Sequence, residues 1–340
     1  MRESLVPLRG SGRVLGPVWR ALSLFVLPCL MGCGQHGDST AREPPGAAMD
    51  EARTEARLAS SLRSHVETLA LHFGPRPGSD PELLERVASW IEQRLQAAGC
   101  ATGRQRFEVG DSPYWNVTAE IGGTEGSSPG ILVGAHYDTE PGTPGADDNA
   151  SGVAALIELA GLLCRDPARS RVRFVAFALE EMPYFRTGAM GSFVHARALK
   201  AAGDLPEGML SLEMLGYYAD EPGSQLLPYW FLRWFYPDRG DFIAFVSQLG
   251  SRAFNRRLHG AFAEAADLPA ERLSAPALVP GIDLSDHRSF AAAGVPSVMV
   301  TDTAFYRNPH YHAPTDLPDT LDYERLARLV LGLESTLRSL

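Results

Sequence analysis

The sequence predicts an α/β protein, a single-domain three-layer α/β/α sandwich around a largely parallel, mixed central sheet. Short apolar runs of strand length recur along the chain, at residues 131–135, 172–179, 209–212 and 297–301. Segments with helical periodicity separate several of these runs, most clearly residues 152–164. Strands that alternate with helices are typical of a largely parallel sheet covered by helices on both faces. The sequence shows no internal repeat and no boundary to a second domain.

The N-terminal residues are predicted to direct export. Four arginines precede a short apolar stretch at 21–31, which is too short to span a bilayer but has the length of a signal-peptide core. It ends at Gly32-Cys33, which resembles a bacterial lipoprotein cleavage box and implies that Cys33 becomes the lipidated first residue. We therefore expect a lipoprotein-type signal peptide at 1–32 and a flexible tether at 33–50, rich in small, polar, proline and glycine residues. Plain secretion and an uncleaved N-terminus are the alternatives.

The remaining residues, 51–340, are predicted to form the folded domain. Apolar residues at helical spacing predict a first helix at 51–73. A second helix has Asp80 as its N-cap, Pro81 at its first position and Gly99 as its stop signal. The strands and helices named above follow, and a last helix begins near Asp322.

Composition excludes several classes of protein. The 340-residue chain is 45% hydrophobic and 21% charged, with a net charge of −10, which argues against nucleic acid as its partner. Four cysteines without a CxxC pair exclude a disulfide scaffold and a zinc finger. Export would place Cys100 and Cys164 in an oxidising compartment, where they can pair. The membrane is expected to be contacted only through the N-terminal lipid, and the sequence does not reveal the oligomeric state.

Residues with metal-binding side chains follow the predicted strands at their carboxyl ends. In an open α/β sheet, ligands bind outside these ends, so the side chains are expected to converge. They are His136 and Asp138 after the first strand, Glu180 and Glu181 after the second, Glu213 after the third, His310 and His312 beyond the fourth, and Asp147 and Asp148 in the turn at 145–152. Mixed nitrogen and oxygen ligands suit catalytic Zn²⁺, with Mn²⁺ or Co²⁺ as alternatives.

Each of these residues also has an ordinary structural interpretation. A single histidine at a strand end is usually a hydrogen-bonded loop residue, and Asp147-Asp148 would serve as turn and N-cap residues. The pair Glu180-Glu181 is harder to explain in this way. It follows a run of eight residues, seven of them apolar, in a strand predicted to be buried, where two charges are costly without a cation. The combination of these positions therefore favours a metal site.

Six separated motifs resemble the zinc aminopeptidase family with a co-catalytic metal pair. This family includes bacterial leucyl aminopeptidases, and glutamate carboxypeptidase and the glutaminyl cyclases are relatives. The motifs are AHYDT (135–139), PGADDNASGVAALIELA (144–160), ALEEMPYFRTGAMGS (178–192), LEMLGYY (212–218), SDHRSF (285–290) and YHAPTD (311–316). They occur in the family's order over residues 65–335, without an inserted domain.

The resemblance implies roles for individual residues. His136 and His312 would each bind one of two zinc ions, and Glu181 would bind one. The carboxylate of Asp148 would bridge both ions, with a cis peptide bond between Asp148 and Asn149. Glu213, where the family often has aspartate, would complete the ligand set. Glu180 would act as general base, and Asp138 would orient the His136 ring. Tyr311 would steady the oxyanion. Asp286, His287 and His310 would contribute to the substrate pocket, whereas Arg76 is interpreted as structural.

The expected function is a metal-dependent exopeptidase that removes N-terminal residues from peptides. Two metal ions would activate a water molecule, and Glu180 would carry its proton to the leaving amine. Aminopeptidase is preferred to carboxypeptidase because the single-domain form resembles the former. The protein is expected to be a periplasmic or outer-membrane lipoprotein, or else secreted. The aromatic segment at 229–245 is expected either to pack in the core or to form an apolar wall over the cleft.

Four other classes of protein are alternatives to this expectation. A glutaminyl cyclase would use the same scaffold with one zinc ion, held by Asp148, Glu181 and His312. A binding lipoprotein with an inactive site would have lost a ligand or the base, and none is missing. A serine hydrolase is excluded because GSSPG at 126–130 precedes a strand rather than a helix. The HExxH motif of helix-borne zinc proteases is absent.

Overall fold

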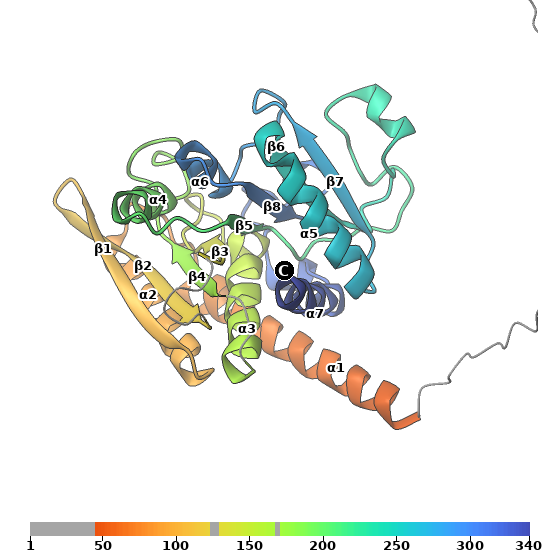
Figure 1. The fold of residues 1–340 in the computed structure, drawn as a ribbon, viewed down its shortest axis with the longest axis horizontal. Helices are drawn as coiled ribbons and strands as arrows, with labels where there is room; N and C mark the ends of the chain where they lie inside the picture. The colour runs from red at the N-terminus through yellow and green to blue at the C-terminus, as the bar shows by residue number, and fades with distance from the viewer. Residues whose placement is uncertain (1–44, 123–128, 167–170) are drawn as a thin grey trace, which may run out of the picture. The chain divides into compact units, whose positions relative to one another are not determined.

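The computed structural model describes residues 45–122, 129–166 and 171–340. Within these residues one sheet has the strand order β1-β2-β4-β3-β5-β8-β6-β7 (Figure 1). Its strands are β1 (Ala101–Val109), β2 (Ser112–Ile121), β3 (Ile131–His136), β4 (Val172–Phe177), β5 (Gly208–Glu213), β6 (Ile243–Gln248), β7 (Ala270–Ala275) and β8 (Ser297–Thr301).

The centre of the sheet is parallel, and the predicted α/β class is confirmed. Strands β4, β3, β5 and β8 run parallel to one another and correspond to the four apolar runs in the sequence. All their residues are buried, as expected for strands covered on both faces. Antiparallel pairing of β2 with β4 and of β6 with β8 makes the sheet mixed. Parallel strands end at the same edge, so β3, β4 and β5 deliver their following residues to one place.

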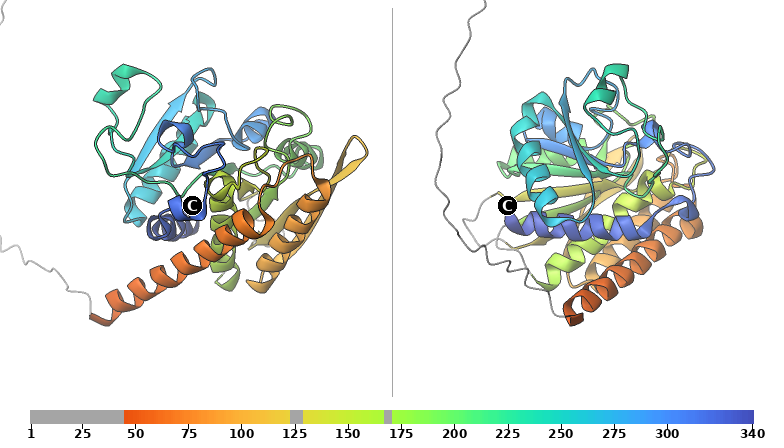
Figure 2. Two further views of the ribbon diagram at one scale, coloured as in Figure 1. Left: turned by 180° about the vertical axis from the view of Figure 1, so that it is seen from behind. Right: turned by 90° about the vertical axis from the view of Figure 1, so that its right-hand side faces the viewer.

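Helices cover both faces of the sheet, as the two views in Figure 2 show. One face carries α1 (Pro45–Glu67) with its continuation η1 (Thr68–Phe73), α2 (Pro81–Ala97), α3 (Gly152–Arg165), α5 (Arg252–Ala265) and α7 (Tyr323–Ser339). The other carries α4 (Gly191–Ala202) and α6 (His287–Ala293). Short helical segments are η2 (Ala146–Ser151), η3 (Trp230–Trp234), η4 (Leu249–Ser251), η5 (Ala304–Tyr306) and η6 (Pro318–Thr320). Among the described residues, none of the helices has the length and apolar character needed to cross a bilayer.

Several predicted boundaries are confirmed. The side chain of Asp80 accepts a hydrogen bond from the Leu83 N–H at 2.9 Å, and the Asp322 side chain caps α7 in the same way. Helix α1 begins at Pro45, earlier than the predicted start of the folded domain at residue 51. Residues 1–44, which include the predicted signal peptide and Cys33, lie outside the described residues.

A disulfide joins the start of the sheet to the helix that follows the turn at 145–152. Cys100, just before β1, and Cys164, near the end of α3, are bonded with their Cα atoms 5.4 Å apart. The pairing that the sequence left open is therefore present in the structure. It fastens the β1–β2 edge of the sheet to the helical layer.

Candidate metal centre

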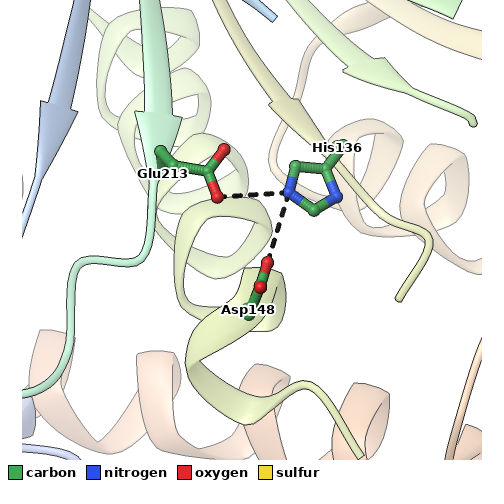
Figure 3. A group of neighbouring side chains, drawn as sticks. All are labelled: His136, Asp148 and Glu213. Atoms are coloured by element: carbon green, nitrogen blue, oxygen red, sulfur yellow. Dashed lines mark hydrogen bonds and ion pairs between the residues drawn. The ribbon is translucent and has the colours of Figure 1, made fainter. Parts of the chain in front are cut away.

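Three buried side chains meet at the carboxyl edge of the sheet (Figure 3). His136 is the last residue of β3, Glu213 is the last of β5, and Asp148 lies in η2 between β3 and α3. The Nε2 atom of His136 is 3.4 Å from Oδ1 of Asp148 and 3.4 Å from Oε1 of Glu213. One nitrogen and two carboxylate oxygens thus surround a common point, as the ligands of a metal ion do.

A second group of ligand atoms adjoins the first through Asp148. The other oxygen of Asp148, Oδ2, is 3.2 Å from Nε2 of His312, and Oε2 of Glu181 is 3.5 Å from the same nitrogen. Glu140, which the sequence analysis did not single out, lies with Glu181 and His312 in a group of possible ligands. Asp148 therefore presents one oxygen to each histidine, as a carboxylate that bridges two metal ions would. The His312 side chain is 31% exposed, so this half of the site faces solvent.

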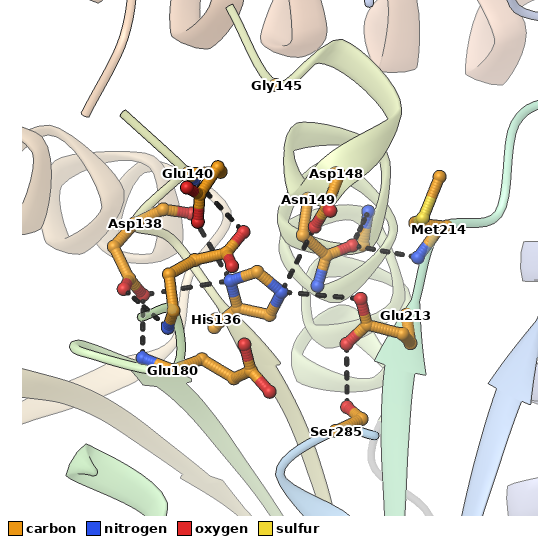
Figure 4. Close-up of polar contacts among 12 residues, drawn as sticks. His136, Asp138, Glu140, Gly145, Asp148, Asn149, Glu180, Glu213, Met214 and Ser285 are labelled. Atoms are coloured by element: carbon orange, nitrogen blue, oxygen red, sulfur yellow. Dashed lines mark hydrogen bonds and ion pairs between the residues drawn. The ribbon is translucent and has the colours of Figure 1, made fainter. Parts of the chain in front are cut away.

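Asp138 holds the two consecutive glutamates (Figure 4). Its carboxylate accepts hydrogen bonds from the backbone N–H groups of Glu180 and Glu181, both at 3.0 Å. The nearest partner of His136 Nδ1 is the backbone carbonyl of Asp138 at 3.2 Å, and the carboxylate is 3.6 Å away. Asp138 thus lies beside the imidazole with its carbonyl nearer than its carboxylate, and orientation of the ring by the carboxylate stays a prediction. Asp138 also positions the predicted base and its neighbour, which the sequence analysis did not foresee.

The cluster contains more carboxylates than cationic groups. Burial raises the pKa values of Glu180 and Glu181 well above the ordinary range. Burial by itself would lower the pKa of His136, but the neighbouring carboxylates, Glu213 above all, raise it well above its ordinary value. A buried site with more carboxylates than cationic groups stabilises added positive charge.

The residues present fit a metal pair. All donors are imidazole nitrogens and carboxylate oxygens, the set that zinc takes in catalytic sites. Oδ1 of Asp148 is buried and accepts no hydrogen bond from the described part of the chain. Burial would raise the pKa of Asp148, but His136 and His312 outweigh it and lower that pKa. The carboxylate is therefore held ionised and available as a ligand.

The loops that carry the ligands are held by further buried groups. The carboxylate of Asp316 accepts hydrogen bonds from the N–H groups of Asp147 at 2.9 Å and Asp148 at 3.1 Å. The Arg76 guanidinium, fully buried, donates to the carbonyls of Tyr137 at 2.9 Å and Gly145 at 3.0 Å. The structural interpretation of Arg76 is confirmed. Asp316 ends the YHAPTD motif, which was its only signal in the sequence.

Unusual backbone conformations occur next to the ligands. Leu179 before Glu180, Met214 after Glu213, and His312 itself have φ values of 63°, 47° and 53°. Side-chain-bearing residues rarely adopt these left-handed conformations, which cluster at functional sites. The Asp148-Asn149 peptide is cis, as the family resemblance implies.

The predicted pocket residues occupy different environments. The Tyr311 ring stacks on His312, with centroids 3.8 Å apart. Asp286 is fully buried near His136, and burial raises its pKa to about 7. His287 is also buried, where Nε2 donates to the Ile282 carbonyl at 2.8 Å.

Both predicted pocket histidines therefore have local structural contacts. Burial lowers the pKa of His287 to about 4, so its neutral ring serves the hydrogen bond to the preceding loop. His310 has its Nδ1 2.9 Å from the Thr315 hydroxyl and its ring edge against Tyr217. The structure assigns both residues to loop contacts, and roles for them in substrate binding stay predictions.

An apolar cavity of about 100 Å³ lies beside the cluster, bordered by Glu213 and Tyr311. Its wall includes Leu226, Leu232, Tyr236, Phe242, Ile282 and Met299. Part of the aromatic segment 229–245 thus forms an apolar wall, as one interpretation expected. The other interpretation, that the segment packs in the core, is wrong for Trp230 and Trp234, because these side chains are 67% and 66% exposed.

Fold and cluster together define a metal-dependent hydrolase, with nitrogen and oxygen ligands at the carboxyl ends of a parallel sheet. The chain belongs to peptidase family M28, whose sequence profile matches residues 116–334. It is therefore a metal-dependent peptidase, and the predicted family is confirmed.

Relatives and solved structures agree with this assignment. The chain is 41% identical to the uncharacterized protein YfbL of Escherichia coli over 80% of this chain and 85% of that protein. It is 27% identical to leucine aminopeptidase 1 of Arthroderma otae over 74% of this chain and 67% of that protein.

Two solved structures share the fold. The zinc aminopeptidase BSAP of Bacillus subtilis matches 82% of this chain and 94% of its own, with a TM-score of 0.64 and 16% identity. A Bacteroides thetaiotaomicron glutaminyl cyclase matches 83% and 98%, with a TM-score of 0.63 and 18% identity.

Proposed function

We propose that this metallopeptidase is an aminopeptidase that uses two zinc ions to hydrolyse the first peptide bond of its substrates. The observation that carries the proposal is the position of Asp148, which presents one carboxylate oxygen to His136 and the other to His312. Oδ1 of Asp148 is 3.4 Å from Nε2 of His136, and Oδ2 is 3.2 Å from Nε2 of His312. A single metal ion would not need a carboxylate shared between two histidines in this way.

The ligands divide into two sets with Asp148 in common. His136 and Glu213 would complete the buried set, and His312 and Glu181 the more exposed one. Zinc ions bound here would lower the pKa of a bound water and polarise the scissile carbonyl. Glu213 has one methylene more than the aspartate often found in the family. A 2.6 Å hydrogen bond from the Ser285 hydroxyl to Oε2 holds its longer side chain.

Glu180 is suited to act as general base. It is buried at the edge of the cluster, and its raised pKa makes it a better proton acceptor than an exposed glutamate. The hydrogen bond of its N–H to Asp138 fixes its backbone. It would take the proton of the attacking water and return it to the leaving amine. Tyr311, whose ring stacks on His312, would donate its hydroxyl to the developing oxyanion.

The adjoining cavity indicates the substrate side chain. Its wall is mostly apolar, and it borders Glu213 directly. A peptide whose N-terminal side chain is hydrophobic would fill this cavity while its first carbonyl reaches the metal ligands. We propose that hydrophobic N-terminal residues are preferred, and that Asp286 hydrogen-bonds a metal ligand or the substrate amine.

Metal content and activity test the proposal on one sample. We expect two zinc ions per chain, chelator-sensitive release of p-nitroaniline from leucyl-p-nitroanilide, and no release from the N-acetylated substrate. Manganese or cobalt would restore activity after chelation if the site accepts them. Hydrolysis of the acetylated substrate would contradict aminopeptidase action.

A glutaminyl cyclase remains the second candidate, supported by the matching cyclase fold and by Asp148, Glu181 and His312, which suffice for one zinc ion. The same experiment separates the two. One metal ion per chain, with cyclisation of N-terminal glutamine in place of hydrolysis, would favour the cyclase.

We also propose that the protein is exported and anchored by a lipid on Cys33, in the periplasm or at the outer membrane. The Cys100–Cys164 disulfide supports export, since such bonds persist in oxidising compartments. Mass spectrometry of the mature N-terminus tests this proposal. A diacylglyceryl-modified Cys33 is expected, and Cys33→Ser should lack this modification.

A further inference from the structure

Five aromatic side chains are exposed together on one loop. The aromatic loop, residues 229–236, contains η3 and has the sequence YWFLRWFY. Its outward side chains are Tyr229, Trp230, Phe231, Trp234 and Phe235, which are 41%, 67%, 42%, 66% and 73% exposed. Large apolar side chains exposed singly are common, but a contiguous aromatic cluster marks an interaction surface.

The side chains of the aromatic loop face two ways, an inner set towards the cavity and an outer set towards solvent. On the inner side, Leu232 and Tyr236 line the cavity, and the Tyr236 hydroxyl donates to the Arg272 carbonyl of β7 at 3.1 Å. On the outer side, the Trp230 and Trp234 rings pack edge to face, with centroids 5.2 Å apart. The outer rings thus contact one another while they remain exposed.

The composition of the outer side fits a lipid surface. Tryptophan and tyrosine are enriched at the boundary between lipid headgroups and acyl chains, where an apolar ring with a polar edge is favoured. The one charged residue of the aromatic loop is Arg233, whose guanidinium lies over the Trp230 ring at 5.7 Å. In a chain with a net charge of −10, this segment therefore carries positive charge and no carboxylate, which suits an anionic headgroup.

The start of the folded domain lies on the same side of the molecule. In Figure 1 both lie at the right, the aromatic loop at the top and the beginning of α1 at the bottom, and the right-hand view of Figure 2 shows them at opposite ends of the face towards the viewer. The chain between Cys33 and Pro45 spans at most roughly 40 Å when fully extended. A lipid on Cys33 would hold this face close to the bilayer, with the aromatic loop as a second contact.

We infer that the aromatic loop docks on the surface of a lipid bilayer and inserts Trp230, Trp234 and Phe235 at the headgroup boundary. A contact of this kind adds to the membrane binding that a lipid on Cys33 would supply. Docking would also fix the orientation of the domain, because the two contacts lie at separate points of one face. This inference does not depend on the reaction catalysed.

The test uses the processed chain, residues 33–340, with Cys33→Ala so that no lipid is attached. Its sedimentation with phosphatidylcholine–phosphatidylglycerol vesicles is measured, together with tryptophan quenching by brominated acyl chains. Trp230→Ala/Trp234→Ala is compared with a matched control, Leu71→Ala/Leu249→Ala, which removes apolar side chains that are 59% and 54% exposed elsewhere. Hydrolysis of a small chromogenic peptide substrate reports that each variant is folded.

We expect the parent and the control to bind vesicles with quenched tryptophan fluorescence. The double tryptophan variant should bind at least about tenfold more weakly, since burial of one large apolar side chain accounts for such a factor. Equal binding of all three chains, or no binding by the parent, would overturn the inference. Loss of self-association in the tryptophan variant without any vesicle binding would overturn it in favour of a second copy.

Discussion

Acid should destabilise the fold through a buried histidine that is remote from the metal ligands. His195 on α4 is 9% exposed and packs against Phe177 and Phe290. Its Nδ1 donates to Oε1 of Gln105 at 2.8 Å. Burial, with Arg173 nearby, lowers its pKa from 6.5 to about 4, so the folded protein keeps the ring neutral where the unfolded chain protonates it.

The sign and size of the effect follow from this pKa difference. Between pH 6.5 and pH 4 the unfolded chain binds the proton more tightly, so stability falls as pH falls through this window. The full difference corresponds to about 3 kcal/mol, of which about 2 kcal/mol should be lost between pH 7 and pH 5. Below pH 4 His195 contributes no further loss.

Urea unfolding at pH 7 and pH 5, followed by tryptophan fluorescence, measures this loss. His195→Asn serves as the comparison, because its amide can still donate to Gln105 and does not titrate. The variant should be less stable than the parent at pH 7 but should lose about 2 kcal/mol less on acidification. An identical loss in both proteins would show that His195 is not the group responsible, whatever the other histidines contribute.

The remaining predictions concern the metal centre. Glu180→Gln should retain metal but lower kcat by about 10²–10⁴, the range for loss of a general base, and near-normal turnover would remove Glu180 from this role. His312→Ala should lower the number of metal ions per chain, measured by native mass spectrometry of the intact protein. Full occupancy would show that another residue is the ligand. Ser285→Ala should weaken binding of one metal ion by about 10–100-fold, because the hydroxyl orients a ligand. Ser192→Ala, which removes another buried hydroxyl of the same region, should leave metal affinity unchanged.

The central part of the fold was predictable because its strands have a simple pattern. Strands β3, β4, β5 and β8 are buried on both faces and therefore appear as continuous apolar runs. The outer strands β1 and β7 are only half-buried and include residues such as Arg104 and Glu271, so no apolar run marks them. Edge strands depend on pairing with neighbours, which a single sequence does not display.

The site was predictable to the extent that its residues follow strand ends directly. His136, Glu180 and Glu213 do so, and the sheet brings them together. Glu140 and Ser285 were missed because their contacts with the cluster arise from tertiary packing. The aromatic loop was also ambiguous, because seven apolar or aromatic residues around one arginine do not reveal which side chains face inward.

The buried Arg76 makes the floor of the site a single cooperative unit. Its guanidinium binds carbonyls of η1 and of both ends of the loop between β3 and η2, two segments that are distant in sequence. Opening any one of these segments would leave a charge in the interior without a partner. The segments should therefore exchange their amide hydrogens together and slowly, near the rate of global unfolding. Substrate would meet a rigid floor, and adjustment to different side chains would fall to the walls of the cavity.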